Sequence, residues 1–329
     1  MTQLRIRTAS RLHFGLLGWG PQAPRQFGGV GLMIEAPGIE LLAEPAANWS
    51  FAGPLADRAQ DTLRQIQEQR IQLPVDRPEV APARIQVVAA PPDHVGLGVG
   101  TQLSLAVVRI VLKLAGDSDP SVESLAALSA RGRRSGIGLH GFLRGGLIVD
   151  GGRRDEVHPP PLVARMPFPE DWSILIVQPP GPRGRHGPDE LQAFSDLPPL
   201  PDRVTERLCR LVLLGILPAV AERDLPAFGA ALDELQARIG AAFAPVQGSV
   251  YASAQSEGII AELGRLGLSG AGQSSWGPTL YAFGLLSEPE RDLVASRLRE
   301  RCGLHPTAIT WTRAANQGAL LAPADEAEA

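Results

Sequence analysis

The sequence has little cysteine and no long apolar run, and each lack excludes a class of protein. Two cysteines, Cys209 and Cys302, cannot by themselves build a disulfide framework or a zinc site. No run approaches the roughly 18 apolar residues of a membrane span, and the first ten residues lack the apolar stretch of a signal peptide. We therefore expect a cytoplasmic protein that binds no membrane.

Positive charge does not exceed negative charge either. The chain has 31 lysine and arginine residues against 35 aspartate and glutamate residues, a formal net charge of −4. Since nucleic-acid binders usually carry a basic excess, we expect no nucleic acid as a partner. A length of 329 residues and an apolar share of 44% suit a globular protein with two domains.

Proline is abundant and clustered, which helps to divide the chain. Thirty prolines include clusters at 158–172, 178–188 and 197–202. Such segments make poor interior helix or strand, because proline lacks an N–H donor. The first cluster is the best boundary, so we predict domains at 1–165 and 166–329.

The hydrophobic patterning mixes helices with strands. Alternation predicts a strand at 3–10, and residues 29–44 suggest two strands around a turn at 36–38. Helical spacing predicts a helix at 55–70 and a central, buried one from residue 101. Without strict alternation of strand and helix, the α+β class fits best.

Three glycine-rich segments are candidates for binding an anion. In 91–104, three alternate glycines free the backbone before a helix, which suits either phosphate oxygens or a tight turn. The segment 269–279 adds hydroxyls and an amide, and could bind anions or form a hairpin. The segment 135–146 reads as a loop and contains no carboxylate. Between residues 131 and 154 there are six arginines and only one carboxylate, Asp150. That excess of basic residues suggests a site for an anionic ligand; alternatively, the arginines lie on the surface and are solvated.

Three such segments in this order resemble the GHMP kinase superfamily. The resemblance rests on "RLHFGLLG" at 11–18, on 92–100 as the phosphate loop, and on Gly270-Ala271-Gly272. It implies a two-domain α+β fold with the active-site cleft between the domains.

The departures from the kinase pattern change the expected chemistry. Gly138 stands where related kinases carry the aspartate that activates the substrate hydroxyl, and Val99 and Gly100 replace the paired serines of the loop. Kinase activity, which needs an oriented nucleophile and a metal-neutralised phosphate, is therefore not expected.

One branch of the superfamily shows the same departures. The segments 96–107, 132–152 and 272–283 resemble the β-ribofuranosylaminobenzene 5'-phosphate synthases. The resemblance implies a transferase of methanopterin biosynthesis that joins phosphoribosyl pyrophosphate to 4-aminobenzoate or 4-hydroxybenzoate, releasing pyrophosphate and carbon dioxide. The alternatives are a GHMP-type kinase with a base from elsewhere in the chain, and a binding protein without catalysis.

On this hypothesis the site residues fall into groups by role. The candidate catalytic residues are His13, His140 and Arg144. The phosphate-binding candidates are Gly96, Gly98, Gly100, Thr101, Gln102, Arg134 and Ser135. The substrate-binding candidates are Arg11, Gln273, Ser274, Ser275, Trp276, Arg183 and Arg185, the last two in a basic segment that could close as a lid. We expect Mg²⁺, with Glu35 as a candidate ligand, no organic cofactor, and a homodimer.

Overall fold

The computed structural model describes residues 3–72, 80–132, 134–181, 184–185 and 187–326, and its strands form two sheets. In this described part, the larger sheet has the order β11-β1-β2-β4-β3, with β5 paired to β2 and β6 to β5. The smaller sheet has the order β10-β7-β9-β8. The strands are β1 Leu4–Gly18, β2 Phe27–Pro45, β3 Ser50–Ala52, β4 Ala83–Ala89, β5 Leu147–Asp150, β6 Leu162–Met166, β7 Ser173–Val177, β8 Ser269–Gln273, β9 Leu280–Gly284, β10 Ile309–Thr312 and β11 Leu320–Pro323.

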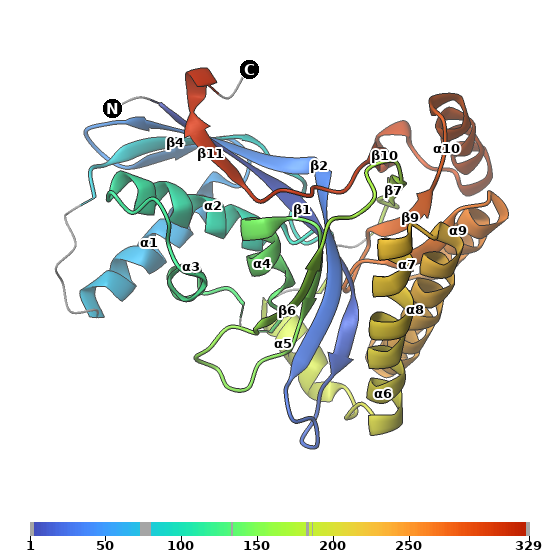
Figure 1. The fold of residues 1–329 in the computed structure, drawn as a ribbon. Coiled ribbons are helices and arrows are strands. Elements are labelled where there is room, and N and C mark those ends of the chain that lie inside the picture. Colours follow the sequence, from blue (N-terminus) through green and yellow to red (C-terminus); the bar gives the residue numbers. More distant parts are fainter. Residues whose placement is uncertain (1–2, 73–79, 133, 182–183, 186, 327–329) are drawn as a thin grey trace.

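Helices cover both sheets, and the α+β class is confirmed. Helices α1 to α4 gather beside the larger sheet, and α6 to α10 lie with the smaller one (Figure 1). The helices are α1 Ala56–Gln72, α2 Val99–Leu114, α3 Val122–Ser129, α4 Ile137–Arg144, α5 Gly187–Asp196, α6 Asp202–Leu211, α7 Leu217–Glu222, α8 Leu225–Gln247, α9 Ala254–Arg265 and α10 Glu288–Cys302, with a π-helical turn at Val212–Ile216 between α6 and α7. None of the helices in the described ranges is long and apolar enough to cross a membrane.

The smaller sheet is buried on both faces, which explains its apolar sequence. In β9, Tyr281 and Phe283 pack into the main core with Phe14 and Phe228. The alternate residues of β7 and β9 face a second core under α9 and α10, consisting of Leu175, Val177, Leu280 and Ala282 with Ile259, Leu263 and Leu298. Strands covered on both sides lose the alternation of polar and apolar residues.

Strand β1 connects the two layers and positions the site. Its first residues, Leu4 to Arg7, pair with β11 near the other end of the described chain (Figure 1). It pairs with β2 from Leu4 to Gly18, and it packs against α8. The predicted division at residue 165 stays a prediction, but β11 shows that the C-terminal part of the chain completes the N-terminal sheet.

Two local predictions were wrong. Residues 36–38 do not separate two strands: β2 runs through them, and they form a bulge, since Thr8 pairs with Ile39 while Ser10 pairs with Ile34. The segment 135–146, which looked like a loop, contains helix α4, whose glycines allow close packing. A Cβ at Gly138 would lie 3.0 Å from Thr101 Cγ2 on α2, so a larger residue would push the two helices apart.

Candidate functional site

A cavity of about 960 Å³ lies where the N-terminal and C-terminal parts of the chain meet. Its lining comes from β1, Arg58 of α1, residues 93–101, residues 130–132 and 134–135, α5, α8, and Gln273, Ser275 and Trp276. All three glycine-rich segments of the sequence therefore contribute to one cavity. A single large cavity lined by several elements is the usual form of a small-molecule site.

The loop before α2 faces this cavity. Gly98 has φ +70° and ends the loop, and Val99, Gly100 and Thr101 form the first turn of the helix and line the cavity. Gly96 has φ +91°, and a Cβ there would lie 2.5 Å from the carbonyl oxygen of Ser274. The positive end of the α2 helix dipole favours an anion at this position.

Arginines outnumber carboxylates on the cavity wall. Six arginines line it, against three carboxylates; the arginines are Arg11, Arg58, Arg131, Arg134, Arg153 and Arg185. Asp93 pairs with Arg58, Glu190 with Arg134 at 2.7 Å, and Glu156 with Arg153 at 3.5 Å. The remaining three guanidinium groups leave an excess of positive charge in a protein that is acidic overall.

Some of these guanidinium groups have nitrogen atoms that are buried without a partner. Within the described residues, Arg11 Nε, Arg131 Nε and Arg134 Nη1 make no hydrogen bond. Burial, together with the charge of neighbouring arginines, lowers the pKa of both Arg11 and Arg131 to about 10, so both remain protonated at neutral pH. Buried donors without acceptors are costly unless a ligand supplies the acceptors, and phosphate oxygens suit guanidinium donors well.

Part of the cavity wall is aromatic. Trp276 stacks on Phe243, with 4.6 Å between ring centroids and 8° between ring planes. Phe194 of α5 meets both rings edge-on. The guanidinium of Arg185 lies 5.9 Å from the Trp276 ring centroid, and that of Arg134 lies 5.2 Å from the Phe194 centroid. A flat ring with an anionic group fits such a wall, because its face can pack on aromatic carbon while an arginine takes the charge.

His13 lies on β1 two residues after Arg11, beside a register shift in the pairing of β1 with β2. Its side chain is 5% exposed. Burial, and then the charge of Arg11, hold the pKa of this imidazole well below its usual range. His13 is therefore neutral at neutral pH, and can accept or donate a hydrogen bond without adding charge.

The segment 269–279 supports the first loop more than it lines the cavity. The Ser274 hydroxyl accepts from the His13 N–H at 3.0 Å and donates to the Gly96 carbonyl at 2.6 Å. The Gln273 amide lines the cavity but is already engaged, accepting from the Ala252 N–H and donating to Gln247 and the Ser275 carbonyl. These hydrogen bonds hold the N-terminal motif, the phosphate loop and the C-terminal motif together.

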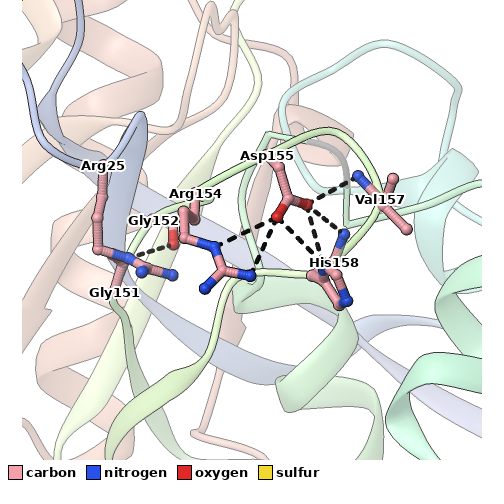
Figure 2. A network of polar contacts seen from close by, with 7 residues as sticks. All are labelled: Arg25, Gly151, Gly152, Arg154, Asp155, Val157 and His158. Carbon is pink, nitrogen blue, oxygen red and sulfur yellow. Dashed lines mark hydrogen bonds and ion pairs between the residues drawn. The ribbon is translucent and has the colours of Figure 1, made fainter.

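A loop after β5 carries Arg153 and Glu156 to the cavity rim. The guanidinium of Arg25 donates to the carbonyls of Gly151 and Gly152 at its base (Figure 2). At its tip, the Asp155 carboxylate accepts from the backbone N–H groups of Val157 and His158 (Figure 2). The hydrogen bonds from His158 hold the pKa of this carboxyl below its usual range. These hydrogen bonds give the loop a defined conformation, although most of it is exposed.

Most of the predicted site residues line the cavity. They are Arg11, His13, Gly96, Gly98, Gly100, Thr101, Arg134, Ser135, Arg185, Gln273, Ser275 and Trp276. Arg183 lies outside the described residues. Of the predicted lid, Arg185 donates to the Val246 carbonyl at 3.0 Å, and the Gly184 N–H donates to the His94 carbonyl at 2.8 Å.

Five predicted residues lie elsewhere, which corrects their expected positions. Gln102 and Ser274 are fully buried, and Gln102 joins Thr8 to the Gly138 carbonyl. His140 is buried with Nε2 2.7 Å from the Pro160 carbonyl oxygen. Arg144 is exposed at the end of α4, and Glu35 is exposed in the bulge of β2. None of the five lines the cavity.

Sequence reasoning missed several lining residues that come from other elements. Arg58 lies on α1, Glu190 and Phe194 on α5, and Gln236 and Phe243 on α8. Arg131 was noticed only as one of a basic cluster. No pattern of neighbouring residues marks these positions as functional, because the sequences of their helices are those of ordinary amphipathic helices.

The residues of the cavity do not form a protein-held magnesium site. The described residues contain no group of three or more histidine, cysteine, aspartate or glutamate side chains placed to hold a metal ion. Each lining carboxylate is also paired with an arginine. Mg²⁺ prefers carboxylate oxygens together with substrate phosphates, so this donor set does not fit a resident ion.

Comparison with known proteins relates the chain to both kinases and synthases. Residues 216–304 match the family model of the C-terminal domain of GHMP kinases. A beta-ribofuranosylphenol 5'-phosphate synthase of Methanothermobacter thermautotrophicus is 33% identical, over 97% of this chain and 98% of its own length. The enzyme of the same name from Archaeoglobus fulgidus is 34% identical, over 85% of this chain and 87% of its own length.

Solved structures share the fold at low sequence identity. A homoserine kinase of Cytophaga hutchinsonii superposes with a TM-score of 0.63 at 15% identity, covering 98% of each chain. A mevalonate diphosphate decarboxylase of Staphylococcus aureus gives a TM-score of 0.61 at 13% identity, also covering 98% of each chain. The predicted GHMP-kinase-like fold is thereby confirmed.

Proposed function

Since this chain belongs to the beta-ribofuranosylphenol 5'-phosphate synthase family, we propose that it joins phosphoribosyl pyrophosphate to 4-hydroxybenzoate. The bond between ribose C1 and the pyrophosphate oxygen breaks, and its electron pair leaves with the pyrophosphate. The ring carbon that carries the carboxylate gives a π pair to C1. The bond to the carboxyl carbon then breaks, its pair restores the aromatic ring, and carbon dioxide leaves. The step needs no net gain or loss of a proton.

One observation carries this proposal: arginines and a cluster of aromatic rings line the same cavity. The first turn of α2, with Arg11 and Arg131 beside it, suits the departing pyrophosphate, whose charge grows as the C1–O bond breaks. Donors placed where charge develops contribute about 3–4 kcal/mol each to lowering a barrier. The wall of Trp276, Phe243 and Phe194 suits the acceptor ring, with Arg185 near its carboxylate.

His13 lines the same cavity from β1. Loss of pyrophosphate leaves positive charge at ribose C1, and a second cation beside it would oppose this charge. Burial lowers the pKa of His13 and keeps its side chain neutral, so it does not repel this positive charge. We therefore assign to the neutral side chain of His13 a hydrogen bond with the ribose or with the acceptor.

Magnesium enters the proposal only as part of the substrate. The lining carboxylates are engaged by arginines, so a magnesium ion at this site would arrive bound to the pyrophosphate oxygens. The chain's own contribution to neutralising the diphosphate is then its arginines.

The test is release of labelled carbon dioxide from carboxyl-labelled 4-hydroxybenzoate. We expect release only with phosphoribosyl pyrophosphate, together with one pyrophosphate per carbon dioxide. Parallel assays with 4-aminobenzoate, and with and without magnesium, define the acceptor and the ion. Steady ADP release from ATP with an alcohol, in the absence of this reaction, would indicate a kinase. Binding of phosphoribosyl pyrophosphate without turnover would indicate a non-catalytic protein.

A substitution in the aromatic wall distinguishes binding of the acceptor from binding of phosphoribosyl pyrophosphate. Phe243→Leu should raise the KM for 4-hydroxybenzoate about tenfold, because it removes the ring that stacks on Trp276. The KM for phosphoribosyl pyrophosphate should stay unchanged. If only the latter KM rises, the acceptor does not lie against this wall.

A further inference from the structure

Gly100 is a glycine that its backbone conformation does not require. It lies in the first turn of α2 with helical geometry, where glycine is among the least favourable residues. Its neighbour Gly98, by contrast, has φ +70° and needs glycine for that reason alone. The reason for a glycine at position 100 therefore lies in its surroundings.

The side chain of Arg58 occupies the space next to Gly100. A Cβ at residue 100 would lie 2.8 Å from Arg58 Nη2 and 3.2 Å from its Cζ. Arg11 lies in the same way against Gly98, where a Cβ would be 3.3 Å from its Nε. Two guanidinium groups, one from α1 and one from β1, thus lie against the same helix turn.

Arg58 is held in place by one nitrogen and leaves another available. Its Nη1 pairs with Asp93, which also accepts the His94 N–H at 2.9 Å. In the described part of the chain, every hydrogen bond recorded for the Arg58 side chain uses Nη1. Nη2, the atom that faces Gly100, is free to donate toward the first turn of α2.

We propose that Arg58 binds the leaving diphosphate across Gly100, and that residue 100 is a glycine to give the guanidinium this position. The identity of the ligand rests on the proposed function. A guanidinium presents a fixed fork of donors that matches two phosphate oxygens. Placed where the diphosphate gains charge as the C1–O bond breaks, Arg58 does part of what a metal ion does at other diphosphate sites.

The test is calorimetric titration of the full chain with inorganic pyrophosphate in magnesium-containing buffer. Arg58→Gln should weaken binding about 10- to 100-fold, the usual loss for a charge-assisted hydrogen bond. Arg64→Gln is the matched control, because Arg64 lies on the same helix but is exposed and paired with Asp61 at 2.7 Å. It should leave the affinity unchanged.

Gly100→Ala tests the role of the glycine with every charge retained. Its methyl group displaces the guanidinium of Arg58, so binding should weaken about three- to tenfold. Because residue 100 acts through Arg58, the double variant R58Q/G100A should bind no more weakly than R58Q alone. Non-additive effects of this kind mark two residues that share one interaction.

Three results would overturn the proposal: no pyrophosphate binding by the wild type, wild-type affinity in folded R58Q, or additive losses in the double variant. If R58Q fails to fold, unchanged affinity in G100A is decisive against it. The titration contains no acceptor, so it is independent of the synthase assay. If pyrophosphate binding depends on Arg58 but the protein releases no carbon dioxide, only the proposed function is rejected. If the protein releases carbon dioxide and R58Q binds pyrophosphate as tightly as the wild type, only this inference is rejected.

Discussion

The two glycine-rich segments at 96–101 and 269–279 have similar compositions and different roles in the structure. The first ends in the opening turn of α2, where Gly98, Gly100 and Thr101 line the cavity. In the second, the side chains of Gln273 and Ser274 form hydrogen bonds to neighbouring residues. Both patterns suggest an anion site, but in the second the side chains of Gln273 and Ser274 are already engaged by the protein.

The two segments differ in how many of their polar groups already form hydrogen bonds within the protein. A buried hydroxyl that already accepts one bond and donates its proton has little left for a substrate, as Ser274 illustrates. A helix start flanked by unpaired guanidinium nitrogens has both donors and charge to offer. The second segment therefore contributes to binding by fixing the shape of the first.

The largest effect should come from the first segment. Gly98→Val places a β-branched residue at φ +70° with its Cβ 3.2 Å from the Arg11 Cβ, so we expect at least a roughly 100-fold loss of kcat/KM for phosphoribosyl pyrophosphate. Gly116→Val is the control. It imposes the same strain at φ +84° at the other end of α2, with no atom within 4 Å of the added Cβ. Equal losses of activity in both variants would show that strain alone explains the first.

A smaller effect on activity, but a clear one on stability, should come from the second segment. Ser274→Ala leaves the His13 N–H and the Gly96 carbonyl without their partner, which should lower the free energy of unfolding by about 2 kcal/mol. Urea denaturation measures this loss. Ser296→Ala, which removes a surface hydrogen bond to Glu300, should cost little. Unchanged stability with weakened substrate binding would instead place Ser274 in direct contact with the ligand.

His13, where the two segments meet, should make stability depend on pH. The unfolded chain binds a proton at this imidazole below a pH of about 6.5, whereas burial keeps the folded form neutral. Stability should therefore fall as the pH drops, by about 1 kcal/mol from pH 7 to pH 5.5 through this residue alone. The measurement compares wild type with His13→Gln by denaturation at both pH values. Identical pH dependence in the two proteins would contradict the assignment.

The smallest effect is expected from a residue that lies outside both segments. Arg144 is exposed at the last turn of α4 and does not line the cavity. Arg144→Ala should leave the KM for phosphoribosyl pyrophosphate within twofold of wild type, whereas Arg131→Gln should raise it. A rise with Arg144→Ala would mean that α4 moves toward the ligand when substrate binds.

Much of the site was visible in the sequence because its backbone requirements are local. Glycines at 96 and 98 have positive φ values, and a glycine loop ahead of a buried helix is a pattern of neighbouring residues. For the opposite reason, the sequence did not show that His140 and Arg144 lie outside the cavity lining. His140 and Arg144 stand beside conspicuous glycines, but the pitch of helix α4 and its packing decide where their side chains point.

By itself, the sequence determined the α+β class, the order of the three glycine-rich motifs and the family, since these depend on neighbouring residues and their spacing. Only the tertiary structure decided which polar groups remain free in the cavity and which distant helices complete it. Arg58 from α1 and Phe243 from α8 are separated from the loop by long stretches of chain. They reach the cavity only when helices and sheets pack, because burial of apolar surface, and not any local pattern, brings those elements together.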